Sequence, residues 1–185
     1  DCKQANATVI MHRKLAEEAV MIALNWRAVG SVSIAMFQLQ IVPVSWAQGV
    51  TGDTILIGQS AALSGPAEEL GKEMKAGAQA YFDVVNKSGG INGRKIKLVS
   101  LDDGYEPEKA AANTKKLIEE ERVLALFGYV GTPTSNAALP IFTGAKVPFI
   151  GAFTGAQSLR EPFNRYVFNV RASYFDETEQ IVGHL

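Results

Sequence analysis

The stretch "VLALFGYVGTPTSNAA", residues 123–138, carries the strongest signal for the fold. Its first five residues are continuously apolar, which is typical of a central parallel strand covered on both faces. Glycines and hydroxyl residues follow directly, and the pattern then predicts a helix over about 133–143. A buried strand that leads through a short loop into a helix is the repeating unit of an α/β sheet.

The same alternation continues on both sides of this stretch. Further strands are expected at 55–57, 95–101, 147–150 and 166–170. Helices are expected over a segment with an apolar face from 74 to 85, over about 107–121, and from about 176. Strands joined by helices pair in parallel, so we predict a doubly wound parallel sheet with a flavodoxin-like strand order. Lys97 and Ser100 place the 95–101 strand at a sheet edge.

The first quarter of the chain has a different character. Residues 28–46 carry no charge, follow Arg27, and lead to small residues at Ser45 and Ala47. We interpret 1–47 as an upstream extension and secretory signal cleaved after Ala47; an uncleaved membrane anchor is the alternative. Either way, we expect the folded part to be exported, to the periplasm. Three residues interrupt the apolar stretch and favour the signal: Gln38, Gln40 and Pro43.

The start of the chain is expected to lie upstream of the natural initiation site. Because the sequence opens on Asp1, we expect translation to begin at Met11 or Met21. Cys2 is the sole cysteine and would be lost with the signal, leaving no thiol or disulfide. The chain also stops inside a helical pattern at Leu185, so we expect a truncated sequence.

Composition and motifs exclude several classes of function. The net charge of −1 gives no electrostatic argument for nucleic-acid binding. Glycine-rich nucleotide loops and the Gly-x-Ser-x-Gly motif are absent, and the two histidines lie too far from the other candidates for a triad or a zinc site. Asp102 and Asp103 are interpreted as turn chemistry. We therefore predict no enzyme, no cofactor, no metal and no contact with a membrane beyond the signal segment or a transporter.

Ligands of open parallel sheets bind beyond the carboxyl ends of the strands. After the third strand, we expect Thr132 to cap the helix, with Pro133 as its first residue and Gly131 before it. The amides of Thr134 and Ser135 would then meet a carboxylate at the positive end of the helix dipole. The alternative is that Thr132 caps its own helix and nothing binds.

The loop after the fourth strand repeats this composition. Phe153, Thr154 and Gly155 combine a hydroxyl with small residues that let the backbone approach a ligand. Tyr105, Tyr129 and Phe153 fall at the same sheet edge and could wall a small pocket, and Tyr174 could belong to a crossover between lobes. The alternative for each aromatic residue is ordinary packing.

Several motifs together resemble a known family. They are Leu63-Ser-Gly-Pro66, Gly89-Gly-Ile-Asn-Gly-Arg94, Asp102-Asp103 with Pro107, and Val147-Pro148. The sequence from about residue 55 onward resembles the amino-terminal lobe of periplasmic solute-binding proteins of the branched-chain amino acid (leucine/isoleucine/valine) transporter class, the type I periplasmic binding fold. The resemblance implies two lobes joined by a hinge, a small ligand clamped between them, and delivery to an ABC permease. It also implies that Thr132 and the pair Phe153 and Thr154 bind the α-carboxylate of the ligand.

The resemblance predicts the domain organisation. Residues 48–170 would form the amino-terminal ligand-binding lobe, and 171–185 the hinge crossover and the start of a missing second lobe. The ligand would be an amino acid or a related small carboxylate, and the extra aromatic residues favour a larger or aromatic one. A ligand-sensing regulatory domain without a permease partner, and an enzyme of flavodoxin-like architecture, remain as alternatives.

Overall fold

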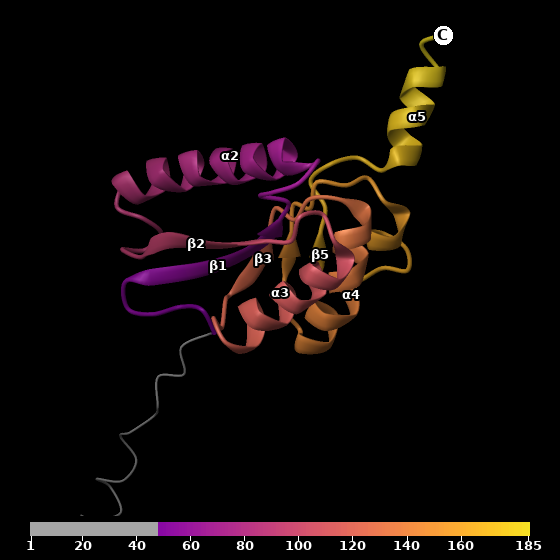
Figure 1. Ribbon diagram of the computed structural model, residues 1–185. Coiled ribbons are helices and arrows are strands. Elements are labelled where there is room, and N and C mark those ends of the chain that lie inside the picture. The colour runs from indigo at the N-terminus through magenta and orange to yellow at the C-terminus, as the bar shows by residue number, and fades with distance from the viewer. Residues whose placement is uncertain (1–47) are drawn as a thin grey trace, which may run out of the picture. The chain divides into compact units, whose positions relative to one another are not determined.

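The computed structural model describes residues 48–185, so the predicted extension and signal over 1–47 lie outside the described residues. Strands and helices alternate from the start of the described part (Figure 1). In chain order they are β1 (Thr54–Ala61), α2 (Glu68–Lys87), β2 (Lys95–Asp102), α3 (Pro107–Glu119), β3 (Ala125–Phe127), α4 (Thr132–Ala145), β4 (Phe149–Ile150), the 3-10 helix η2 (Gln157–Leu159), β5 (Val167–Phe168) and α5 (Tyr174–Val182).

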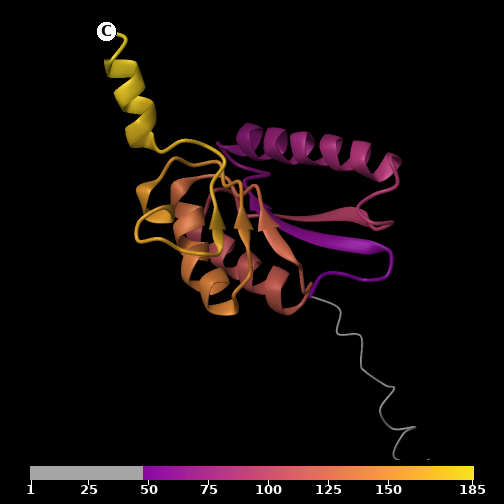
Figure 2. The same ribbon diagram turned by 180° about the vertical axis from the view of Figure 1, so that it is seen from behind.

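The strands form one parallel sheet in the order β2-β1-β3-β4-β5. Helix α2 covers one face, and α3 and α4 cover the other (Figures 1 and 2). The predicted doubly wound sheet with flavodoxin-like order is confirmed, and β2 lies at the edge as predicted. The order reverses between β1 and β3, and ligands of such sheets bind beyond the carboxyl ends of the strands at this reversal.

Aromatic packing fills the core beneath α4. Phe149 is 1% exposed and stacks on Phe142 with ring centroids 4.4 Å apart. Tyr129 meets Phe149 edge-on at 5.0 Å, and its hydroxyl lies 2.9 Å from the Thr114 hydroxyl. Burial raises the pKa of Tyr129 well above its ordinary value. These contacts join α3, β4 and α4 to the loop after β3.

Helix α4 begins differently from the prediction. Gly131, not Thr132, occupies the N-cap position, with φ 100° and ψ 152°, and Thr132 is already helical. Glycine adopts this backbone conformation without the Cβ clash that other residues meet, so the chain turns into the helix one residue early. The prediction of a free Ser135 amide is also wrong, because that amide donates to the Gly131 carbonyl at 3.2 Å.

Local chemistry explains two further boundary differences. β4 begins at Phe149 rather than 147, and Pro148 before it has no N–H to donate to a neighbouring strand. Helix α5 begins at Tyr174 rather than 176 because Ser173 forms a capping box with Asp176. The Asp176 amide donates to the Ser173 hydroxyl at 3.0 Å, and the Asp176 carboxylate accepts from the Ser173 amide at 3.0 Å.

Candidate functional site

Backbone pairing fixes the loops after β3 and β4 side by side at the carboxyl edge of the sheet. Val130 and Phe153 form a parallel bridge beyond the ends of the two strands. The Phe153 amide donates to the Tyr129 carbonyl at 2.7 Å, and the Gly131 amide donates to the Phe153 carbonyl at 3.4 Å. The two loops singled out by the sequence therefore form one continuous surface.

Thr132, which is partly buried, and Thr154, which is fully buried, meet where these two loops adjoin. Their hydroxyl oxygens lie 2.6 Å apart, one from the first turn of α4 and the other from the loop after β4. The Thr154 oxygen also accepts the Ala156 amide at 3.1 Å and lies 3.4 Å from the Tyr174 hydroxyl. The two threonines and Tyr174 therefore form a chain of three hydroxyls.

The three hydroxyls interact with one another. A hydroxyl has one proton and two lone pairs, and the Ala156 amide already takes one lone pair of Thr154. Thr154 therefore donates to one neighbouring hydroxyl and accepts from the other. Tyr174 also interacts with Thr132, so each of the three hydroxyls has a partner within the group.

Two tyrosine rings lie on glycines next to the two threonines. The Tyr105 ring lies over Gly131, where an added Cβ would approach ring atom Cε2 to 2.3 Å. The Tyr174 ring lies over Gly155, where an added Cβ would approach Cδ1 to 2.6 Å. Tyr105 is 37% exposed and Tyr174 45% exposed, so both rings retain free surface beside the hydroxyl pair. Hydrogen bonding to Thr154 lowers the pKa of Tyr174.

Other residues predicted for the site are buried or have polar groups that are already hydrogen-bonded. Tyr129 is fully buried in the core, so the prediction that it walls a pocket is wrong. Thr134 is also buried, and its hydroxyl donates to the Val130 carbonyl at 2.6 Å, which leaves no side-chain donor for a ligand. The amides of Phe153 and Thr154 are engaged by the Tyr129 and Ala152 carbonyls. Thr154 is fully buried, so its hydroxyl serves the contacts with Thr132 and Tyr174, and the 40% exposed Phe153 ring is what this pair presents at the surface.

The buried Asp103 supports the site by holding the backbone of Tyr105. It is fully buried, and its carboxylate accepts the Ser60 hydroxyl at 2.6 Å and the Tyr105 amide at 2.9 Å. Tyr105 has φ 69°, an uncommon conformation for a residue with a side chain, and the Asp103 contact holds it there. The turn chemistry predicted for Asp102 and Asp103 accounts for these bonds, but not for their effect on Tyr105.

Arg160 holds the segment that leaves the sheet, a role that no sequence pattern indicates. Its guanidinium donates to the Ala156 carbonyl at 2.9 Å, to the Arg171 carbonyl at 2.6 Å and to the Ala172 carbonyl at 3.1 Å. These acceptors are backbone groups brought together only by the fold. Arg160 therefore joins the loop after β4 to the chain that carries Tyr174.

We expect Asp103→Asn to change how stability depends on pH. Burial, with smaller contributions from Asp102 and Glu106, raises the pKa of Asp103 above its ordinary value. The stability contributed by protonated Asp103 is fully present below the unfolded pKa of about 3.9 and is lost as pH rises through the folded pKa. The difference in free energy of unfolding, wild type minus variant, should therefore fall in urea titrations as the pH rises from about 4 through the folded pKa. A difference that stays constant over this range would contradict the assignment.

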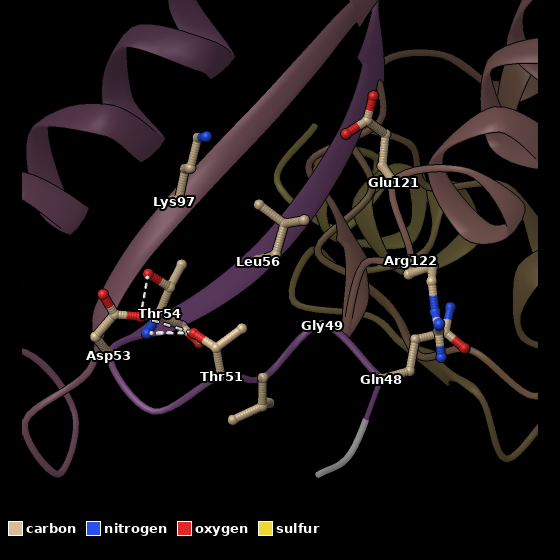
Figure 3. A pocket seen from close by; sticks show the side chains of 10 residues that line it. Gln48, Gly49, Thr51, Asp53, Thr54, Leu56, Lys97, Glu121 and Arg122 are labelled. Carbon is tan, nitrogen blue, oxygen red and sulfur yellow. Dashed lines mark hydrogen bonds between the residues drawn. The ribbon is translucent and has the colours of Figure 1, made fainter.

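Two cavities in the described part lie away from the two threonines. One of about 560 Å³ lies at the amino ends of the strands, where the Asp53 carboxylate accepts from the Thr51 and Thr54 hydroxyls (Figure 3). Another, of about 330 Å³, lies between α4 and the segment before β5.

Within residues 48–185, no cluster of three or more His, Cys, Asp or Glu is placed to hold a metal ion. No helix in the same range is both long and apolar enough to cross a membrane.

Comparisons with known proteins agree with this architecture. The family model described as "Periplasmic binding protein" matches residues 54–185. A Leu/Ile/Val-binding protein of Rhizobium johnstonii is 37% identical over 87 residues, which cover 47% of this chain and 23% of that protein. The crystal structure of a possible leucine/isoleucine/valine-binding protein from Rhodopirellula baltica is 44% identical, with a TM-score of 0.68, over 76% of this chain and 37% of that one.

A third relative differs in its ligand. A solute binding protein of an ABC transporter from Rhodopseudomonas palustris, in complex with 3,4-dihydroxy benzoic acid, is 28% identical, with a TM-score of 0.56, over 65% of this chain and 32% of that one. The chain spans about a quarter of the curated relative and about a third of each solved structure. Because the family model covers most of the chain and the fold agrees, the chain belongs to the periplasmic binding protein family.

Proposed function

We propose that this chain is the first lobe of an exported solute-binding protein that takes up a small carboxylate for an ABC importer. The observation that carries the proposal is the pair of hydroxyls from Thr132 and Thr154, 2.6 Å apart at the carboxyl edge of the sheet. The pair lies at the start of α4, where the helix dipole favours a negative group. The named ligands of the relatives, branched-chain amino acids and a dihydroxybenzoic acid, share a carboxylate and differ in the rest of the molecule.

In the intact protein, binding would proceed by hinge closure. This lobe would contribute the hydroxyl donors, and a second lobe reached through the segment after β5 would close over the exposed rings. The closed state would be favoured because only there does the ligand contact both lobes. Arg160 would fix the near end of the crossover, so that bending occurs beyond the residues whose carbonyls it holds. Export through a cleaved signal over 1–47 is part of the same proposal.

Two other functions have weaker support. An enzyme of this architecture would need a free carboxylate or histidine at the strand ends. Asp102 instead accepts the Leu63, Ser64 and Gly104 amides, and Asp103 is buried and bonded. A ligand-sensing regulatory domain would use the same site without a permease, and genes for transporter subunits beside this one would argue against it.

We expect Thr132→Val to weaken carboxylate binding by about 1–3 kcal/mol, the range for losing a hydrogen bond to a charged group. Valine keeps the shape of threonine but has no hydroxyl, so the hydroxyl chain loses one end. Calorimetry on the complete binding protein would measure the change in affinity.

The control is Thr51→Val. Thr51 lies at the opposite edge of the sheet, where its hydroxyl donates to Asp53 at 2.8 Å. This variant makes the same chemical change and should leave affinity unaltered. Equal affinities for wild type and Thr132→Val would remove Thr132 from the site and, with it, the main support for the proposed function.

A further inference from the structure

We propose that the solute is a planar aromatic carboxylate without an ammonium group, rather than an amino acid. This inference rests on the proposed function and concerns the same site. Its three parts are two tyrosine rings over the glycines next to the two threonines, the commitment of nearby carboxylates to other partners, and a guanidinium placed against the aromatic surface.

The two rings have matched positions relative to the hydroxyl pair. Tyr105 lies over Gly131, the residue before Thr132, and Tyr174 lies over Gly155, the residue after Thr154. The two threonine hydroxyls lie 2.6 Å apart. Each ring therefore lies over a residue directly next to one of these two threonines. A carboxylate at the Thr132 hydroxyl would therefore place the body of its solute beside the Tyr105 ring, since the Tyr174 ring is already contacted by Arg171. Flat rings stack on such surfaces more favourably than saturated rings do.

The ring of Tyr105 is held in place. Its amide is bound by the buried Asp103, its backbone has φ 69°, and its ring lies on a glycine that leaves no room for a side chain. A wall fixed by its own backbone loses little conformational entropy when a solute stacks on it. Tyr105 is therefore suited to select for shape.

The carboxylates among the described residues of these loops already have partners, including Glu106, which pairs with Lys109 at 2.7 Å. Asp102 accepts the Ser64 hydroxyl as well as three amides, and Asp103 is buried. Glu177 binds Arg171 through both oxygens, at 2.6 and 2.7 Å. Within this lobe, an amino acid would give up the hydration of its ammonium group without an ion pair in return.

Arg171 further disfavours a cation. Its guanidinium carbon lies 5.4 Å from the centre of the Phe153 ring and 5.2 Å from that of Tyr174. These are cation–π contacts, so the negative faces that would attract an ammonium group are already used by a cation of the protein. A second cation at the same rings would be repelled, whereas a carboxylate would not.

The test is a panel of matched probes titrated into the full chain and followed by backbone amide shifts in NMR spectra. Benzoate and cyclohexanecarboxylate differ in the planarity of the ring, and 3-phenylpropionate and phenylalanine differ in the ammonium group. We expect benzoate to bind about three- to tenfold more tightly than cyclohexanecarboxylate. We expect 3-phenylpropionate to bind about tenfold or more tightly than phenylalanine. The shifts should centre on Thr132 and Thr154.

A variant and its control assign the preference to the tyrosine wall. Tyr105→Leu should remove most of the advantage of benzoate over cyclohexanecarboxylate. Tyr81→Leu, at a 68% exposed position on α2, should retain it. Tighter binding of isoleucine, phenylalanine or cyclohexanecarboxylate than of the aromatic acids would overturn the ligand class and leave the proposed function standing. If none of the carboxylates shifts the Thr132 and Thr154 amides, both proposals fail.

Discussion

Replacement of Phe149 by alanine should lower the free energy of unfolding by about 3–5 kcal/mol. Phe149 is 1% exposed, stacks on Phe142 at 4.4 Å and meets Tyr129 edge-on at 5.0 Å. Truncation removes the transfer free energy of the ring and leaves a cavity that the neighbouring rings can fill only by leaving their own contacts. Urea or thermal unfolding, followed by circular dichroism, would measure the loss.

Phe163→Ala is the matched control for this prediction. Phe163 is 86% exposed and lies in the segment between η2 and β5, so its truncation should change stability by less than about 0.5 kcal/mol. Similar losses for the two variants would contradict the assignment of the core. The comparison also bears on the site, because the ring of Tyr129 ties Phe149 to the loop that carries Gly131 and Thr132.

Periodicity and punctuation determine most of this fold in advance. The apolar run at 123–127 can be buried on both faces only inside a parallel sheet, and Pro107 marks the first residue of α3. The strand order 2-1-3-4-5 follows from the alternation together with the family resemblance. Element boundaries were less predictable. They depend on single groups such as the missing N–H of Pro148 and the capping box of Ser173, which shift a strand or helix by one or two residues.

The candidate site was only partly predictable, because sequence shows which residues share an edge but not which way they point. Thr132 and Thr154 were expected at adjacent strand ends, and their hydroxyls do meet. Tyr129 was expected at the same edge of the sheet, but its side chain points into the core and its hydroxyl contacts Thr114. The choice depends on backbone torsions at Gly128 and Gly131, where positive φ values redirect the chain on either side of Tyr129. Glycine permits such torsions but does not reveal which one it adopts.

Gly131→Ala should be the most damaging change at the site itself, with a loss of about 2–5 kcal/mol in the free energy of unfolding. Two costs add. Alanine at φ 100° is strained, and its Cβ would come within 2.3 Å of the Tyr105 ring, which cannot remain where it is. Denaturant titration would measure the loss of stability. Calorimetry with benzoate would measure the effect of the displaced ring on affinity. Affinity should fall about tenfold or more, since a displaced wall costs at least 1.4 kcal/mol of binding.

Gly77→Ala separates this effect from the general cost of replacing glycine. Gly77 lies on α2 with no atom within 4 Å of an added Cβ, so alanine there should stabilise the protein by about 0.4–1 kcal/mol. If Gly131→Ala were as stable as wild type and bound benzoate equally well, the position of the Tyr105 ring would not depend on Gly131. The position of the Tyr105 ring beside the hydroxyl pair would then lose its physical basis.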